Sequence, residues 1–147
     1  MVPQTPKVSV MISPQTVTST GTLSGYVDTR GFDYAEILLV ASTTDAPTNN
    51  PTLLYIREHD TTTSATSMTA ITAFAGDGAS GFTVASWSST VDNSTLFCID
   101  LKGRKRYLGI AISPLTTHTL TAVANLYRGD EMPIGTTAAN VINLVTG

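Results

Sequence analysis

Short runs of β-forming residues alternate with glycine, proline and aspartate along this chain, and the pattern predicts an all-β fold. Residues 7–12 and 82–87 alternate polar and apolar side chains, which is the two-residue period of a strand with one buried face. Residues 37–40 are continuously apolar between turn signals, which is typical of a strand buried on both faces. The clearest predicted strands are residues 7–12, 34–41, 53–58, 82–87, 96–101, 107–112 and 119–127.

The spacing of these segments predicts how they are arranged. About eight strands recur at intervals of roughly 8–15 residues, which favours an antiparallel two-sheet sandwich of jelly-roll type over an α/β fold. The 147 residues suit a single domain. Prolines near both ends predict short extended arms at residues 1–6 and 134–147, and residues 141–145 have the alternative of closing a sheet as its last strand.

The centres of the clearest strands predict the hydrophobic core. The predicted core residues are Ile37, Leu39, Phe97, Ile99, Leu108, Ile110 and Val123. Charged residues make up only 13% of the chain, which is well below the ~25% that is usual in globular proteins. Serine and threonine fill the polar positions instead, which suits strands and favours a surface that is largely covered by partner proteins.

The densest positive charge lies between Lys102 and Arg106, a segment that holds half of the eight lysine and arginine residues. Because apolar β-forming runs flank it, the segment is predicted to be the tip of a β-hairpin between residues 96–101 and 107–112, with Gly103 in the turn.

This basic segment has three interpretations. In a structural role, one of its basic residues pairs with Asp100 or Asp28, and Arg106 is the candidate because it adjoins a predicted strand. In a protein contact, the tip meets an acidic patch on a partner. A nucleic-acid patch is disfavoured, because the sequence pI of about 5.1 is acidic. The candidate partner contacts are Lys102, Arg104 and Lys105.

The sequence contains no constellation that predicts catalysis. His59 and His118 are far apart and stand in no metal-binding spacing with another histidine or cysteine. Cys98, the single cysteine, lies in an apolar run and is interpreted as a small buried side chain. The carboxylates between residues 28 and 36 are better explained by turn formation than by a glycosidase pair. We therefore expect no enzyme and no metal or cofactor site.

Three segments together resemble a known protein family. Residues 28–33 have the form Asp-Thr-x-Gly-Phe/Tyr-Asp, residues 100–108 have the form Asp-Leu-x-Gly-Arg-x-Arg-Tyr-Leu, and residues 124–128 read Ala-Asn-Leu-Tyr-Arg. These motifs are similar to those of small β-rich proteins encoded beside the major capsid protein in tailed bacteriophages and prophages. The family is that of head decoration, or capsid cement, proteins. The resemblance extends from about Gly25 to Pro133.

The resemblance implies a structural virion protein that binds the outer surface of a capsid and bridges neighbouring capsomers. Its implied partners are the major capsid protein and further copies of itself, in a dimer or trimer, without nucleic acid, membrane or cofactor. The chain lacks the start of a secretory signal and any run long enough to cross a bilayer, so synthesis in the host cytoplasm is expected.

An alternative function from another class is a carbohydrate- or receptor-binding sandwich of a phage head fibre or tail. Exposed aromatic side chains around Phe74, Phe82 and Trp87 would favour this alternative.

Overall fold

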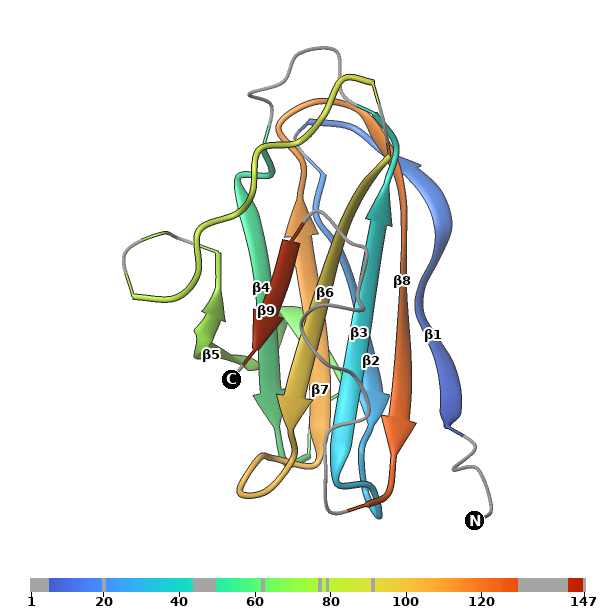
Figure 1. Ribbon diagram of the computed structural model, residues 1–147, viewed down its shortest axis with the longest axis vertical. Coiled ribbons are helices and arrows are strands. Elements are labelled where there is room, and N and C mark those ends of the chain that lie inside the picture. Colours follow the sequence, from blue (N-terminus) through green and yellow to red (C-terminus); the bar gives the residue numbers. More distant parts are fainter. Residues whose placement is uncertain are drawn as a thin grey trace.

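The structure, a computed structural model, describes residues 6–19, 21–43, 50–61, 63–76, 78, 80–90, 92–129 and 143–146. Within these residues the chain forms nine strands in two sheets that pack face to face (Figure 1). The strands are β1 (Lys7–Val17), β2 (Leu23–Asp28), β3 (Tyr34–Ala41), β4 (Leu53–His59), β5 (Thr69–Ala75), β6 (Asn93–Asp100), β7 (Tyr107–Ser113), β8 (His118–Tyr127) and β9 (Asn143–Thr146). One short 3-10 turn, η1 (Ala65–Ser67), precedes β5. No helix in the described part of the chain is long and apolar enough to cross a membrane.

The strand order is that of a jelly roll. One sheet has the order β1-β8-β3-β6-β9 and the other has the order β2-β7-β4-β5. The first eight strands pair in antiparallel fashion as 1-8-3-6 and 2-7-4-5, which is the arrangement of two Greek keys in a double-sheet jelly roll. Strand β9 adds to this arrangement by pairing in parallel with β6. The predicted fold class is therefore confirmed.

The predicted hairpin between residues 96–101 and 107–112 is wrong. Strand β6 pairs with β3 and β9, whereas β7 lies in the other sheet and pairs with β2 and β4. Residues 101–106 therefore pass from one sheet to the other across one end of the sandwich. Both strands are central in their sheets, so their apolar runs reflect burial between neighbours rather than pairing with each other.

Residues 82–87 form a loop rather than a predicted strand. Isolated bonds hold this loop: the Phe82 amide donates to the Ala75 carbonyl at 3.0 Å, and the Trp87 amide donates to Oδ1 of Asn50 at 2.8 Å. Trp87 is buried, and the Phe82 ring packs in an edge contact 5.5 Å from that of Phe97. The alternating pattern therefore reflects aromatic side chains that insert into the core from a loop.

Part of the expected C-terminal arm belongs to the sandwich, in contrast to the expectation. Residues 143–146 form the edge strand β9, with Val145 buried opposite Phe97, in agreement with the alternative of a last strand. The backbone edge of β6 supplies the pairing that makes an extended tail a strand. Residues 1–5, 134–142 and 147 of the expected arms lie outside the described residues.

Six of the seven predicted core residues are buried, and Val123 is not. The six confirmed residues are Ile37, Leu39, Phe97, Ile99, Leu108 and Ile110. On β8, Leu120, Ala122, Ala124 and Leu126 face the core, so Val123 points outward and is half-buried. The small alanines rather than the larger valine occupy the inner positions of this strand.

This division of faces predicts the cost of two matched truncations. Ile99→Ala removes a fully buried side chain, and we expect its free energy of unfolding to fall by about 2–5 kcal/mol in urea titrations. Val123→Ala, on the outer face of the same sheet, should lower it by less than about 1 kcal/mol. Equal losses at the two positions would contradict the inward direction of Ile99.

Candidate functional site

The lysine and arginine residues lie at or near one end of the sandwich, the lower end in Figure 1, although the Arg57 side chain contacts Tyr55 and the Ala65 carbonyl on the outer face of the four-stranded sheet. The register fixes this end: Tyr34 lies opposite both Tyr127 and Asp100 in one sheet, and Asp28 lies opposite Tyr107 in the other. The basic residues at or near these strand ends are Lys7, Arg30, Arg57, Lys102, Arg104, Lys105, Arg106 and Arg128. The acidic residues that share this end are Asp28, Asp33, Glu36, Glu58, Asp60 and Asp100.

The described residues at the opposite end carry little charge. Its connections are residues 18–22, 42–52, 87–92 and 114–117, and they are rich in serine and threonine. Among the described residues of these connections, Asp92 is the one charged side chain. Electrostatic attraction to an acidic partner would therefore act through the lower end.

The strongest ion pair of the charged end joins Asp28 to Arg106. The Arg106 Nη2 atom donates to Oδ2 of Asp28 at 2.7 Å, and its Nε atom lies 3.2 Å from both carboxylate oxygens. Asp28 also accepts a bond from the Arg30 amide. The bonds from Arg106 are the main cause that lowers the pKa of Asp28 from 3.8 to about 2. This pair confirms the structural interpretation for Arg106, with Asp28 as its partner.

The other possible partner, Asp100, stabilises the backbone of the basic segment instead. Its Oδ1 atom accepts a bond from the Lys102 amide at 2.9 Å. The Arg104 amide donates to the Leu101 carbonyl at 3.0 Å, which closes a turn in which Gly103 has a φ of 77°. Glycine suits this position, because side chains with a Cβ atom rarely adopt a positive φ.

The predicted contact residues Arg104 and Lys105 face acids of their own domain, over longer distances. Arg104 Nη1 lies 3.9 Å from Glu58, and Lys105 Nζ lies 3.5 Å from Asp60. The Lys105 and Asp60 side chains are 44% and 65% exposed. An exposed pair such as Lys105–Asp60 contributes only about 0–1 kcal/mol; the Arg104 and Glu58 side chains are 28% and 17% exposed, but their contact is longer. Lys102 is exposed, and none of the described acidic residues forms an ion pair with it.

A second cationic cluster at this end has no counterpart in the sequence analysis. Lys7 Nζ lies 5.7 Å from the centre of the Phe32 ring, and the Arg128 guanidinium lies 5.1 Å from it. Both distances are within the range of a cation–π interaction. The cluster forms because the fold brings the start of β1, the β2–β3 turn and the end of β8 together. The one local signal is that each cation adjoins a strand end.

The other sequence candidates do not assemble into a catalytic or metal site. His118 is buried, bonds to Thr116 and Ser42, and stacks edge-on against Trp87. Within the described ranges, no group of three or more His, Cys, Asp or Glu side chains is placed to hold a metal ion. Cys98 is buried, and this burial is the main cause that raises its thiol pKa to about 11.

The carboxylates between residues 28 and 36 serve separate structural roles. Asp33 Oδ2 accepts a bond from the Gly129 amide at 2.9 Å. Glu36 is buried on the outer face of the five-stranded sheet, where Tyr127 donates to its Oε2 atom at 2.8 Å. Desolvation, followed by this bond, raises the pKa of Tyr127 to about 12.

The aromatic side chains that would favour carbohydrate binding are part of the core. Phe74 and Trp87 are buried, and Phe82 is half-buried against the core. These rings therefore stabilise the sandwich and are not available as a stacking platform for a sugar.

Comparisons of this chain with protein-family models, with curated proteins and with solved structures find no match.

The Asp28–Arg106 pair predicts an acid-dependent contribution to stability. Because the folded carboxylate has the lower pKa, this contribution is complete above about pH 4 and is lost as the pH falls toward about pH 2. We expect Asp28→Asn to melt at a lower temperature than the original chain at neutral pH. The difference between their melting temperatures should then shrink steadily in acid.

Asp60→Asn is the matched control, since it removes an exposed carboxylate with one long contact. It should melt close to the original chain at every pH. An Asp28→Asn difference that is the same in acid as at neutral pH would refute the stabilising role assigned to this pair.

Proposed function

We propose that this chain is a structural virion protein of the decoration, or cement, type, which binds the outer surface of a tailed-phage capsid. The observation that carries the proposal is that seven of the eight basic residues, all except Arg57, lie at one end of a sandwich whose net charge is −3. In the proposed arrangement the protein attaches to an acidic surface with its basic end and directs the serine- and threonine-rich end away from that surface. The resemblance of residues 28–33, 100–108 and 124–128 to decoration proteins supports the same function.

The proposed partners are the major capsid protein and further copies of this chain in a dimer or trimer. Single surface ion pairs are weak, so attachment depends on several contacts made at once by one oligomer. Linking them raises the total affinity through effective concentration, without any single strong site. The shell is then stabilised by mass action, because the protein binds the assembled lattice and not its separated subunits.

Lys102, Arg104 and Lys105 are the proposed capsid contacts. Lys102 is exposed, and the long pairs of Arg104 with Glu58 and of Lys105 with Asp60 are weak enough to exchange for acidic groups on a capsid. Arg106 has the structural role in the same segment, because its bonds to Asp28 are shorter and more numerous.

The copy number in virus particles tests this proposal directly. Quantitative mass spectrometry of purified virions should find hundreds of copies of a decoration protein in each particle. A count of only a few copies would instead favour the alternative, a receptor- or carbohydrate-binding module of a head fibre or tail.

The division of roles in the basic segment yields a further prediction. Arg104→Ala/Lys105→Ala should have a melting temperature close to that of the original chain, because the Lys105–Asp60 pair is exposed and the Arg104–Glu58 contact is 3.9 Å long. It should weaken binding to purified capsids by about tenfold, since a small loss per contact is multiplied across an oligomer. Arg106→Ala should have a lower melting temperature than the original chain. Thermal melting and capsid co-sedimentation measure both effects. The roles would be reversed if the double variant had a lowered melting temperature and Arg106→Ala had the melting temperature of the original chain.

A further inference from the structure

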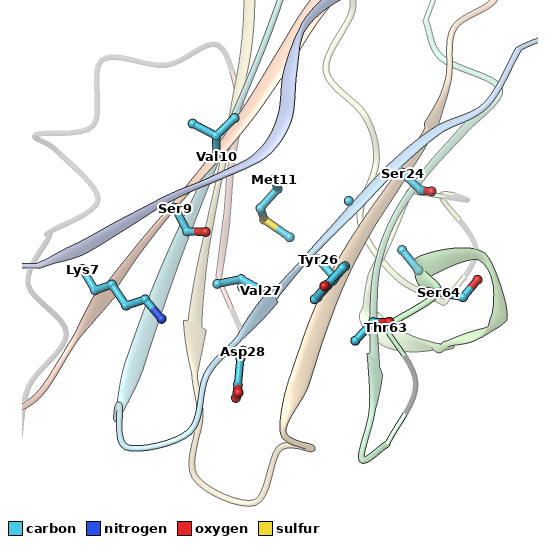
Figure 2. A pocket seen from close by; sticks show the side chains of 12 residues that line it. Lys7, Ser9, Val10, Met11, Ser24, Tyr26, Val27, Asp28, Thr63 and Ser64 are labelled. Atoms are coloured by element: carbon cyan, nitrogen blue, oxygen red, sulfur yellow. The ribbon is translucent and has the colours of Figure 1, made fainter.

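A groove of about 570 Å³ runs beside β2, between the first half of β1 and the loop that precedes η1 (Figure 2). Lys7, Ser9 and Met11 of β1 line one wall, and Thr63 and Ser64 line the other, with β2 between them. The groove opens toward the charged end, where Lys7 begins β1.

Strand β2, which borders the groove, has one edge that pairs with no other described strand. β2 is the outermost strand of its sheet: it pairs with β7 on one side, and no strand among the described residues pairs with its other side. β1 approaches β2 closely at Gly25, where a Cβ atom would lie 1.9 Å from the carbonyl oxygen of Met11. From there the two strands diverge toward Lys7 and Asp28 (Figure 2). The free edge of β2 therefore offers backbone donors and acceptors to an incoming strand.

Lys7 gives the groove an available positive charge. Its Nζ atom lies over the Phe32 ring, and none of the described acidic residues forms an ion pair with it. Asp28, the acidic residue of the lining, is already bound by Arg106 and by the Arg30 amide. An incoming carboxylate therefore meets a cation at Lys7 and no uncompensated negative charge in the groove.

Exposed apolar side chains flank the groove. The large hydrophobic residues that are exposed in the described part of the chain are Val8 (62%), Val10 (58%), Tyr26 (45%) and Leu115 (43%). The first three lie on β1 and β2, the two strands that border the groove. Val8 and Val10 lie opposite Asn125 and Val123 and point outward from the five-stranded sheet. Tyr26, next to the buried Val27, points outward from the four-stranded sheet, so it is the exposed apolar side chain on the strand with the unpaired edge.

We propose that this groove binds an extended, acidic segment of a partner protein, which adds as a further strand along the free edge of β2. Backbone hydrogen bonds to β2 supply the affinity of such strand addition, and alternate side chains supply its specificity. An acidic side chain of the segment meets Lys7, and its apolar neighbours pack beside Tyr26 on the outer face of β2. The proposal is separate from capsid attachment through residues 102–105, because a different surface carries it.

Fluorescence anisotropy with a defined probe tests the groove. The probe is a fluorescein-labelled peptide of ten alternating valine and glutamate residues, titrated with the full chain. We expect saturable binding, and we expect Lys7→Glu to weaken it by about tenfold or more, because a close charge pair becomes repulsive. Lys102→Glu, at an exposed basic position of the same end outside the groove, is the matched control and should stay within about twofold of the original affinity.

A second variant keeps the test valid if Lys7→Glu does not fold. Ser24→Glu places a negative charge in the groove from an exposed position of β2, and it should weaken the binding of the peptide by a similar factor. Hydrogen exchange gives an independent readout: the probe should slow the exchange of β2 amides and leave those of the central strand β3 unchanged.

Three results would overturn the proposal. The first is the absence of saturable binding, and the second is an equal effect of Lys7→Glu and Lys102→Glu. The third is equally tight, Lys7-dependent binding of a single-stranded oligonucleotide of the same charge, which would identify an unspecific anion site. Capsids are absent from this assay, so a negative result would not contradict the proposed decoration function. A low copy number in virions would likewise not contradict the proposed peptide binding in the groove.

Discussion

The burial of two apolar sheet faces against each other is the constraint on which the rest of this molecule depends. Phe97 of β6 is fully buried, and edge contacts join it to Phe74 of β5 and to Phe82 of the following loop. Because side chains fill the space between the sheets, each connection from one sheet to the other crosses at an end of the sandwich. Charged residues cannot enter this interior without a partner, so they lie outside it, and most of those in the described residues are near the ends of the strands.

The two ends then acquire different chemistry. Most of the basic residues and most of the described acidic ones lie near one end, in its connections or in the strands that lead to it, whereas the connections at the other end hold mainly serine and threonine. At the charged end, the lengths of the ion pairs distinguish basic side chains with a structural role from those that are available to a partner. Arg106 is bound by Asp28 through short bonds, whereas the pairs of Arg104 and Lys105 are long. One basic segment therefore both fixes the connection between the sheets and presents cations to solvent.

An open sandwich also leaves free edges, and in this molecule two of them lie on the same side. β1 and β2 are each the outermost strand of a sheet, and their close approach at Gly25 covers only part of the β2 edge. A lysine beside a free edge protects it against uncontrolled strand pairing. Lys7 occupies such a position, and it also lies over Phe32 at the charged end. The groove and the charged end therefore meet at this residue, so a partner with acidic groups can contact both.

The sequence by itself determined the fold class, the strand positions in the main and the inward faces of most strands, because a two-residue period is a local property of the chain. It also limited the partner of the basic segment to two residues, and Asp28 is one of them. Only the tertiary structure decided that β6 and β7 lie in different sheets, because burial on both faces gives the same apolar run whichever strands are the neighbours. It also decided that Val123 faces outward, since the register of β8 turns Ala122 and Ala124 toward the core. The convergence of Lys7 and Arg128 on Phe32 arises in the same way, from segments that are distant in sequence and meet only when the sheets close.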